Sequence, residues 1–70
     1  MEVKEELRVN LVSARTNVGL SQEEAAAEIG VNPATLVNWE KGKTFPNIKQ
    51  AYALAKLYKR PIDYIIFFTA

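Results

Sequence analysis

The side chains that could do chemistry in this 70-residue chain are amides, hydroxyls and charged groups, because the sequence contains no histidine and no cysteine. Those two residue types supply the commonest general base, the commonest metal ligand and the thiolate nucleophile. The sequence also has no glycine-rich phosphate loop and no carboxylate pair that would converge on one site. We therefore expect no enzyme and no cofactor or metal site, and these residue types favour a binding function.

Charge is distributed unevenly along the chain. Residues 1–28 hold six acidic and three basic residues, a net charge of −3, whereas residues 29–70 hold two acidic and six basic residues, a net charge of +4. The second half thus predicts a basic face that favours an anionic partner. Solvated helix faces would give the same counts, so charge alone does not identify the partner.

Length and composition predict one soluble domain spanning residues 1–70, because 49% of the residues are hydrophobic and 24% are charged. The longest apolar stretch, Tyr64–Phe68, is too short to cross a membrane, and the acidic start lacks the basic residues of a signal peptide. We expect a cytoplasmic protein with no membrane partner. A core this small contributes only about 3 to 5 kcal/mol to the free energy of unfolding. With no cysteine for a disulfide, oligomerisation is the way in which the chain could gain further stability.

Glycines and prolines mark the breaks between the expected elements, at Gly19, Gly30, Gly42, Pro46 and Pro61. Before the first break, apolar residues recur at the spacing of one helical face: Val3, Leu7, Leu11, Ala14 and Val18. This predicts a first helix that ends near Asn17. Ser21 and Glu24 then form a capping-box pattern, so a second helix starts at Gln22 and stops at Gly30.

A third helix is predicted from Pro33 to about Lys41, because Asn32 is a good N-cap and proline suits the first helical position. Helical spacing turns Leu36 and Trp39 inward, so we interpret Trp39 as a core residue and not as a base-stacking one. The residues on the outward side of this helix are Pro33, Ala34, Thr35 and Asn38.

Asn47 caps a fourth helix, which Pro61 terminates. Its expected apolar stripe consists of Ile48, Ala51, Tyr52, Leu54, Ala55 and Tyr58. The remaining segment, Ile62–Phe68, could form a short fifth helix, but its β-branched and aromatic residues also suit a strand. The local signal leaves both open.

The runs Gly19–Ala26, Ile29–Leu36 and Trp39–Gly42, followed by Pro46, resemble the lambda-repressor and Cro-like helix-turn-helix family, also called the xenobiotic-response-element family. The resemblance covers roughly residues 11–67. It implies an all-α fold, a compact five-helix DNA-binding domain with its helix-turn-helix at residues 21–41. In such domains the third helix lies in the major groove of double-stranded DNA.

The resemblance also implies which residues touch DNA. The residues placed to read bases are Pro33, Ala34, Thr35 and Asn38, where Thr35 could contact a base or the backbone. The amide of Asn38 matches adenine, whereas small apolar groups suit thymine methyls. The residues placed to contact phosphates are Gln22, Asn32, Lys43 and Thr44.

Two further expectations concern structure and assembly. Arg15 and Glu40 stand where several relatives form a partly buried ion pair between helix one and helix three, so we interpret them as structural and not catalytic. The apolar cluster Tyr64, Ile65, Ile66, Phe67 and Phe68 predicts a homodimer contact within residues 62–70. The alternative is that this segment folds back over helices one and four.

Together these features predict a dimeric, sequence-specific transcriptional regulator that binds an inverted-repeat operator. Repression is the favoured mode because blocking a promoter needs no second domain, although activation would need only a small surface patch. No small-molecule effector is evident. The alternative function is a protein-binding adaptor or antitoxin-like module on the same fold.

Overall fold

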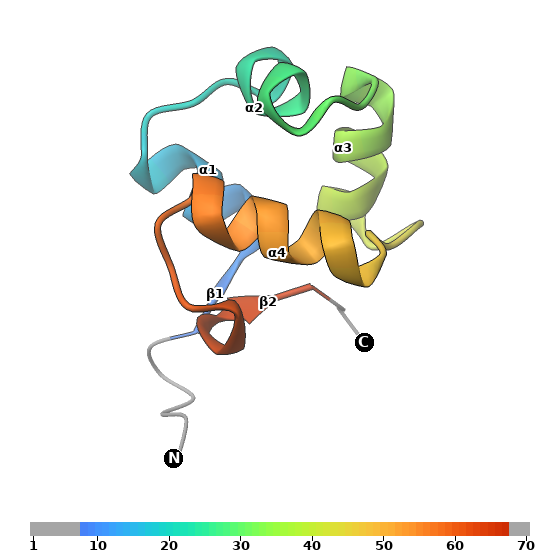
Figure 1. Cartoon of the computed structure of the whole chain (residues 1–70). Coiled ribbons are helices and arrows are strands. Elements are labelled where there is room, and N and C mark those ends of the chain that lie inside the picture. Colours follow the sequence, from blue (N-terminus) through green and yellow to red (C-terminus); the bar gives the residue numbers. More distant parts are fainter. Residues whose placement is uncertain (1–7, 68–70) are drawn as a thin grey trace.

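The computed structural model describes residues 8–67, and the chain within this range folds as four short α-helices with a small strand pair at one end (Figure 1). The helices are α1 (Leu11–Asn17), α2 (Gln22–Ile29), α3 (Pro33–Lys41) and α4 (Ile48–Leu57). The strands are β1 (Val9–Asn10) and β2 (Ile65–Ile66), and a 3₁₀ turn, η2, spans Ile62–Tyr64. The helical character agrees with the all-α expectation.

The fifth helix is not formed. The segment after Pro61 makes the 3₁₀ turn and then β2, which pairs in parallel with β1 so that Ile65 lies opposite Val9 and Ile66 opposite Asn10. Figure 1 shows these two segments, from opposite ends of the chain, side by side below the helices. Consecutive β-branched residues favour the extended backbone that such a pair requires. The five-helix prediction is therefore wrong.

The first helix is also shorter than the apolar spacing predicted. It begins at Leu11, because the Asn10 side chain caps it by accepting a hydrogen bond from the Ser13 amide at 2.8 Å. Val9 precedes the cap and belongs to the strand. Val3 and Leu7, which we assigned to this helix, lie outside the described residues. The expected end near Asn17 is confirmed.

All four helices and β2 contribute to one apolar core. Its buried members are Leu11, Ala14, Ala25, Ala26, Leu36, Trp39, Leu54, Ala55, Tyr58, Ile65 and Phe67. Trp39 is 4% exposed, which confirms the core interpretation of this residue. Among the helices of the described residues, none is long and apolar enough to cross a membrane.

The expected stripe of α4 is only partly buried. Leu54, Ala55 and Tyr58 enter the core, but Ile48 is 77% exposed and Tyr52 is 59% exposed, so the prediction is wrong for these two residues. The residues of α4 that enter the core lie towards its C-terminal end, whereas in its first turn Ala51 packs against the core and Ile48 faces solvent. Helical spacing identifies a common face but not how far along the helix a neighbour covers it.

Candidate nucleic-acid interface

The geometry of α2 and α3 is set by the residues at their ends. Ser21 accepts a hydrogen bond from the Glu24 amide at 3.0 Å, and the Glu24 carboxylate accepts one from the Ser21 amide at 2.8 Å, which confirms the capping box. The hydrogen bond from the Ser21 amide, with a smaller contribution from the Ser21 hydroxyl, lowers the pKa of the exposed Glu24 carboxyl because both favour its charged form. The start of α2 is thus fixed by local interactions.

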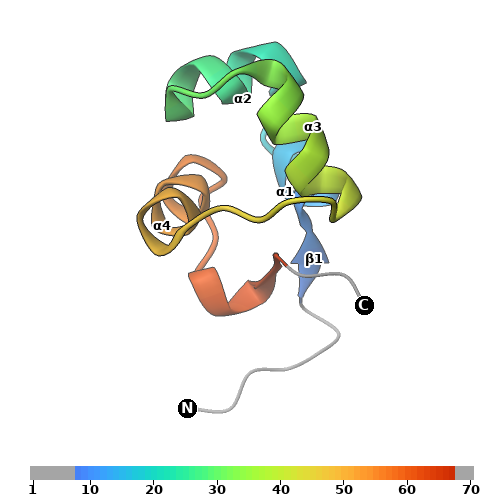
Figure 2. The ribbon, with the colours of Figure 1, turned by 90° about the vertical axis from the view of Figure 1, so that its right-hand side faces the viewer.

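The turn between the two helices depends on Gly30. This glycine has a φ of +84°, the left-handed conformation that closes many helices, and its amide donates to the Ala26 carbonyl at 2.8 Å. Two residues later, Asn32 caps α3 by accepting from the Ala34 amide at 2.9 Å, and Pro33 occupies the first turn. Each of these roles agrees with the sequence prediction. The result is a helix-turn-helix in which a short loop leads from the end of α2 to α3, which runs downward from that loop in Figure 2.

The outer face of α3 is accessible. Pro33 and Ala34 are exposed, Thr35 and Asn38 are half-buried, and the intervening Leu36 is fully buried. The Asn38 side-chain amide makes no hydrogen bond within residues 8–67, although its backbone carbonyl accepts from the Lys43 amide at 2.9 Å. The structure therefore brings the four expected base-reading residues to one helix and leaves the amide group of Asn38 available to a ligand.

The residues expected to contact phosphates lie around this helix, and they differ in exposure and in the hydrogen bonds that they already make within the protein. Lys43 and Thr44 are exposed on the loop that leaves α3. Asn32 is exposed too, and its side-chain oxygen is used by the cap, which leaves its amide hydrogens. Gln22 is half-buried and already has a protein partner, which sequence reasoning missed.

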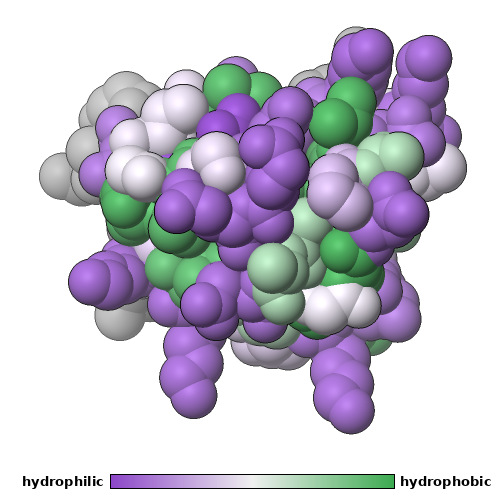
Figure 3. Space-filling model, turned by 90° about the horizontal axis from the view of Figure 1, so that it is seen from above, coloured by the Kyte–Doolittle hydropathy of each residue, from purple (hydrophilic) through white to green (hydrophobic). Residues whose placement is uncertain are grey.

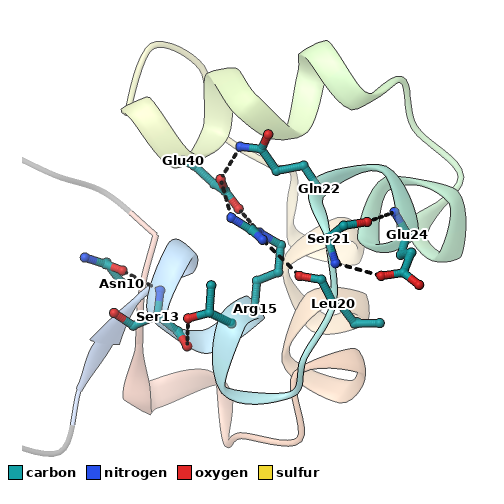
Figure 4. Close-up of polar contacts among 9 residues, drawn as sticks. Asn10, Ser13, Arg15, Leu20, Ser21, Gln22, Glu24 and Glu40 are labelled. Carbon is teal, nitrogen blue, oxygen red and sulfur yellow. Dashed lines mark hydrogen bonds and ion pairs between the residues drawn. The ribbon is translucent and has the colours of Figure 1, made fainter.

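That partner is Glu40, which stands at the centre of a polar network between α1, α2 and α3 (Figure 4). Arg15 Nε lies 2.7 Å from Glu40 Oε2, and the Gln22 side-chain amide donates to Glu40 Oε1 at 2.9 Å. Arg15 Nη1 donates in addition to the Leu20 carbonyl at 2.9 Å. The ion pair implied by the family resemblance is thus present.

The network is buried and strongly polarised. The Arg15 and Glu40 side chains are only 11% and 4% exposed, and the hydrogen bond to Glu40 raises the pKa of the Arg15 guanidinium. Nearby, burial and the Glu40 carboxylate raise the pKa of the Tyr58 hydroxyl to about 12. One amide hydrogen of Gln22 is donated to Glu40, which leaves the second hydrogen available to a ligand. The network holds the start of α2 against the end of α3.

Exposed charges are sorted around the helix-turn-helix. Glu23, Glu24 and Glu28 are exposed on α2, whereas Lys41, Lys43 and Lys49 are exposed at the end of α3 and after it. The top face of the molecule, which carries α2, is mainly hydrophilic (Figure 3). An anionic ligand is therefore attracted more strongly to the lysines at and after the end of α3 than to the part of α2 that carries the glutamates. The described residues contain no cluster of acidic side chains that would hold a metal ion.

The side chains of the segment expected to form a dimer contact differ in how deeply they are buried. Ile65 and Phe67 are buried in the domain, Tyr64 and Ile66 are half-buried, and Phe68 lies outside the described residues. The segment packs against its own chain through Ile65 and Phe67, as the alternative reading held. A homodimer contact by the half-buried pair stays a prediction.

Comparison with known proteins agrees with this geometry. A family model described as "Helix-turn-helix" matches residues 11–65, and the chain belongs to that family, the lambda-repressor-like group. Two helix-turn-helix-type transcriptional regulators of Archaeoglobus fulgidus, both described as uncharacterised, are similar to it. They are 34% and 36% identical over 62 residues, which is 89% of this chain and 89% and 87% of theirs.

A third relative is considerably longer. The helix-turn-helix-type transcriptional activator BcrR of Enterococcus faecalis is 30% identical over 61 residues, which is 87% of this chain but 30% of that protein. No solved structure is a significant match. The family model thus matches most of this chain, whereas this chain corresponds to only part of the longer relative.

Proposed function

We propose that this chain is a sequence-specific DNA-binding transcriptional regulator that acts as a dimer in the cytoplasm and inserts α3 into the major groove. The observation that carries the proposal is the outer face of α3, where the unengaged amide of Asn38 stands on a helix fixed at both ends. Its start is capped by Asn32, and its end is tied to α1 and α2 through Glu40. A rigid helix with free hydrogen-bonding groups is what base recognition requires.

Each exposed residue has a role in this proposal. Asn38 donates to and accepts from one adenine, and Pro33 and Ala34 lie against thymine methyl groups, with Thr35 at the edge of the groove. Gln22, Asn32, Lys43 and Thr44 contact phosphates and fix the position of α3. Few of these groups make base hydrogen bonds, so the site is A·T-rich and is read partly through its shape.

The experiment that tests the proposal is selection of bound sequences from a randomised duplex pool at near-physiological salt. We expect enrichment of an inverted repeat whose half-site centres lie about 34 Å apart, one turn of B-DNA. If no sequence is enriched, the proposal is wrong, and the exposed faces serve a protein-binding module instead.

The sign of regulation is part of the proposal. In this proposal the chain represses by occupying an operator that overlaps a promoter, a mode of action for which the DNA-binding domain suffices. BcrR is named an activator, but this chain matches 30% of its length. The selected operator, placed over a reporter promoter, should lower expression when the protein is produced. A rise in reporter expression would instead show that the protein acts as an activator.

A further inference from the structure

Two large apolar side chains at the start of α4 are more exposed than any others in the described residues. Ile48 is 77% exposed and Tyr52 is 59% exposed, and they lie four residues apart, so they share one face of the helix. Phe45, in the loop just before α4, is also exposed. Single exposed apolar residues are common, but a cluster of large ones marks an interaction site.

A groove lies beside these side chains. It has a volume of about 310 Å³ and is lined by Pro46, Ile48, Ala51, Tyr52, Ile62 and Phe67. None of the lining residues is charged, and the buried Phe67 joins the wall of the groove to the core. We refer to the groove together with Phe45 as the α4 patch.

We propose that the α4 patch is the surface through which two copies of this chain associate. A two-fold contact places the same surface on both partners, so that surface must offer projecting side chains and a hollow to receive them. The α4 patch has both, since Ile48 and Tyr52 project at the rim of the groove that they line. A second copy therefore fits it without any additional segment.

The size of the patch is consistent with this occupant. Its exposed aromatic and aliphatic side chains present apolar surface on the order of a few hundred Å², the largest that an ordinary monomer carries. A standard interface buries about 800 Å² on each partner around such an apolar centre. Asn47, Lys49 and Asp63 are exposed and adjacent in sequence to lining residues, so we assign the polar margin to them. Because this margin holds both signs of charge, a second copy meets no uniformly like-charged surface.

The position of the patch suits paired DNA binding, so the inference rests in part on the proposed function. A loop of six residues, 42–47, leads directly from the end of α3 to the start of α4 (Figure 2). A two-fold axis at the α4 patch then places one α3 on each side of the axis. In this arrangement Ile62 and Phe67 form the groove wall, and the C-terminal segment is a support for the interface.

The test is sedimentation of the free protein, without DNA, for the wild type and two charge variants. Ile48→Glu puts a carboxylate in the α4 patch. The control variant Val12→Glu puts a carboxylate on α1, at an apolar residue that is 41% exposed and lies outside the groove. We expect the wild type and Val12→Glu to be dimers at tens of micromolar. Ile48→Glu should raise the dimer dissociation constant at least about 30-fold, as for a central interface residue.

The proposal is overturned by a wild type that stays monomeric throughout the accessible concentration range, or by Ile48→Glu that dimerises as well as Val12→Glu. Because the chain has no cysteine, single-cysteine variants give a second readout. Tyr52→Cys should yield a covalent dimer with a short bis-maleimide, and Val12→Cys should yield none. Equal cross-linking of the two variants would also refute the interface.

Failure of this inference is distinct from failure of the proposed function. A chain that dimerises through the α4 patch but enriches no DNA sequence refutes the proposed function alone. A monomer that enriches a single, unrepeated half-site refutes the dimer surface and leaves DNA recognition by α3 standing.

Discussion

Asn38 and Lys43 lie five residues apart but should contribute to DNA binding in different ways. The amide of Asn38 stands on α3 and can pair with a base, whereas Lys43 is an exposed charge on the following loop. We expect Asn38→Ala to lose about 1 to 3 kcal/mol of discrimination at one base position. Lys43→Ala should weaken binding to all sequences alike and reduce the salt slope by about one charge. Competition with single-base operator variants at several salt concentrations measures both effects, and a uniform loss in both variants would contradict the placement of α3.

Arg15 and Glu40 form a buried pair in which each charge depends on the other. Removing Arg15 alone, as in Arg15→Met, leaves the 4% exposed carboxylate of Glu40 without its cationic partner. We expect the free energy of unfolding to fall by about 3 to 5 kcal/mol, which is comparable to all that so small a core provides. Urea denaturation measures the loss. The double variant Arg15→Met/Glu40→Leu should be more stable than either single variant, and strict additivity of the two single losses would exclude coupling.

Tyr58 makes the stability sensitive to alkaline pH. Its hydroxyl is buried without a hydrogen-bond partner among residues 8–67, and its pKa in the folded protein is raised from 10.0 to about 12. Between these two values the unfolded chain releases a proton that the folded chain keeps, so stability must fall as pH rises from 10 to 12. Denaturant midpoints across this range measure the decline. Tyr58→Phe should lessen the decline and cost little stability at neutral pH, because the hydroxyl has no partner to lose.

At the scale of elements, the turn between α2 and α3 depends on the backbone conformation of Gly30 and not on close packing around that residue. A Cβ atom built on Gly30 would meet no atom within 4 Å, yet its φ of +84° is one that L residues rarely adopt. We expect Gly30→Ala to cost about 1 to 2 kcal/mol from the left-handed conformation alone, and Gly30→Asn to cost less. Thermal melting monitored by circular dichroism checks the order. A greater loss for asparagine than for alanine would point to a steric cause.

The elements that the sequence predicted well are those determined by neighbouring residues. The caps at Ser21, Asn32 and Asn47 and the stop at Gly30 all depend on groups within a few positions, and all are present. The pairing of β1 with β2 joins residues 56 positions apart, Val9 with Ile65, and no local pattern reports it.

The candidate site shows the same division between local and distant information. Helical spacing placed Asn38 on the outer face of α3, and family resemblance supplied the pair of Arg15 with Glu40. The bond from Gln22 to Glu40 spans 18 residues and was missed. Exposure of Ile48 and Tyr52 was missed as well, because spacing cannot show where coverage by other elements ends. Distant contacts, therefore, were found by resemblance or not at all.

At the scale of the whole molecule, the proposed dimer links assembly to DNA binding. With a net charge of +1 and only α3 to place in the major groove, one copy of the proposed regulator should make few phosphate contacts and gain little from counterion release. Two copies joined through the α4 patch present two recognition helices at once. The second helix then binds in an intramolecular step, at the effective concentration set by the dimer.

This linkage between the dimer surface and DNA gives a prediction about operator halves. Scrambling one half-site of the selected inverted repeat should weaken binding of the wild type by about 100-fold or more, since avidity between linked sites is of that order. For Ile48→Glu, which loses the dimer contact but keeps α3 intact, the same change should weaken binding only a few-fold. Titration of both duplexes with both proteins by fluorescence anisotropy gives the two ratios. Equal ratios would mean that the halves are not coupled through α4, because the variant differs from the wild type only at that exposed side chain.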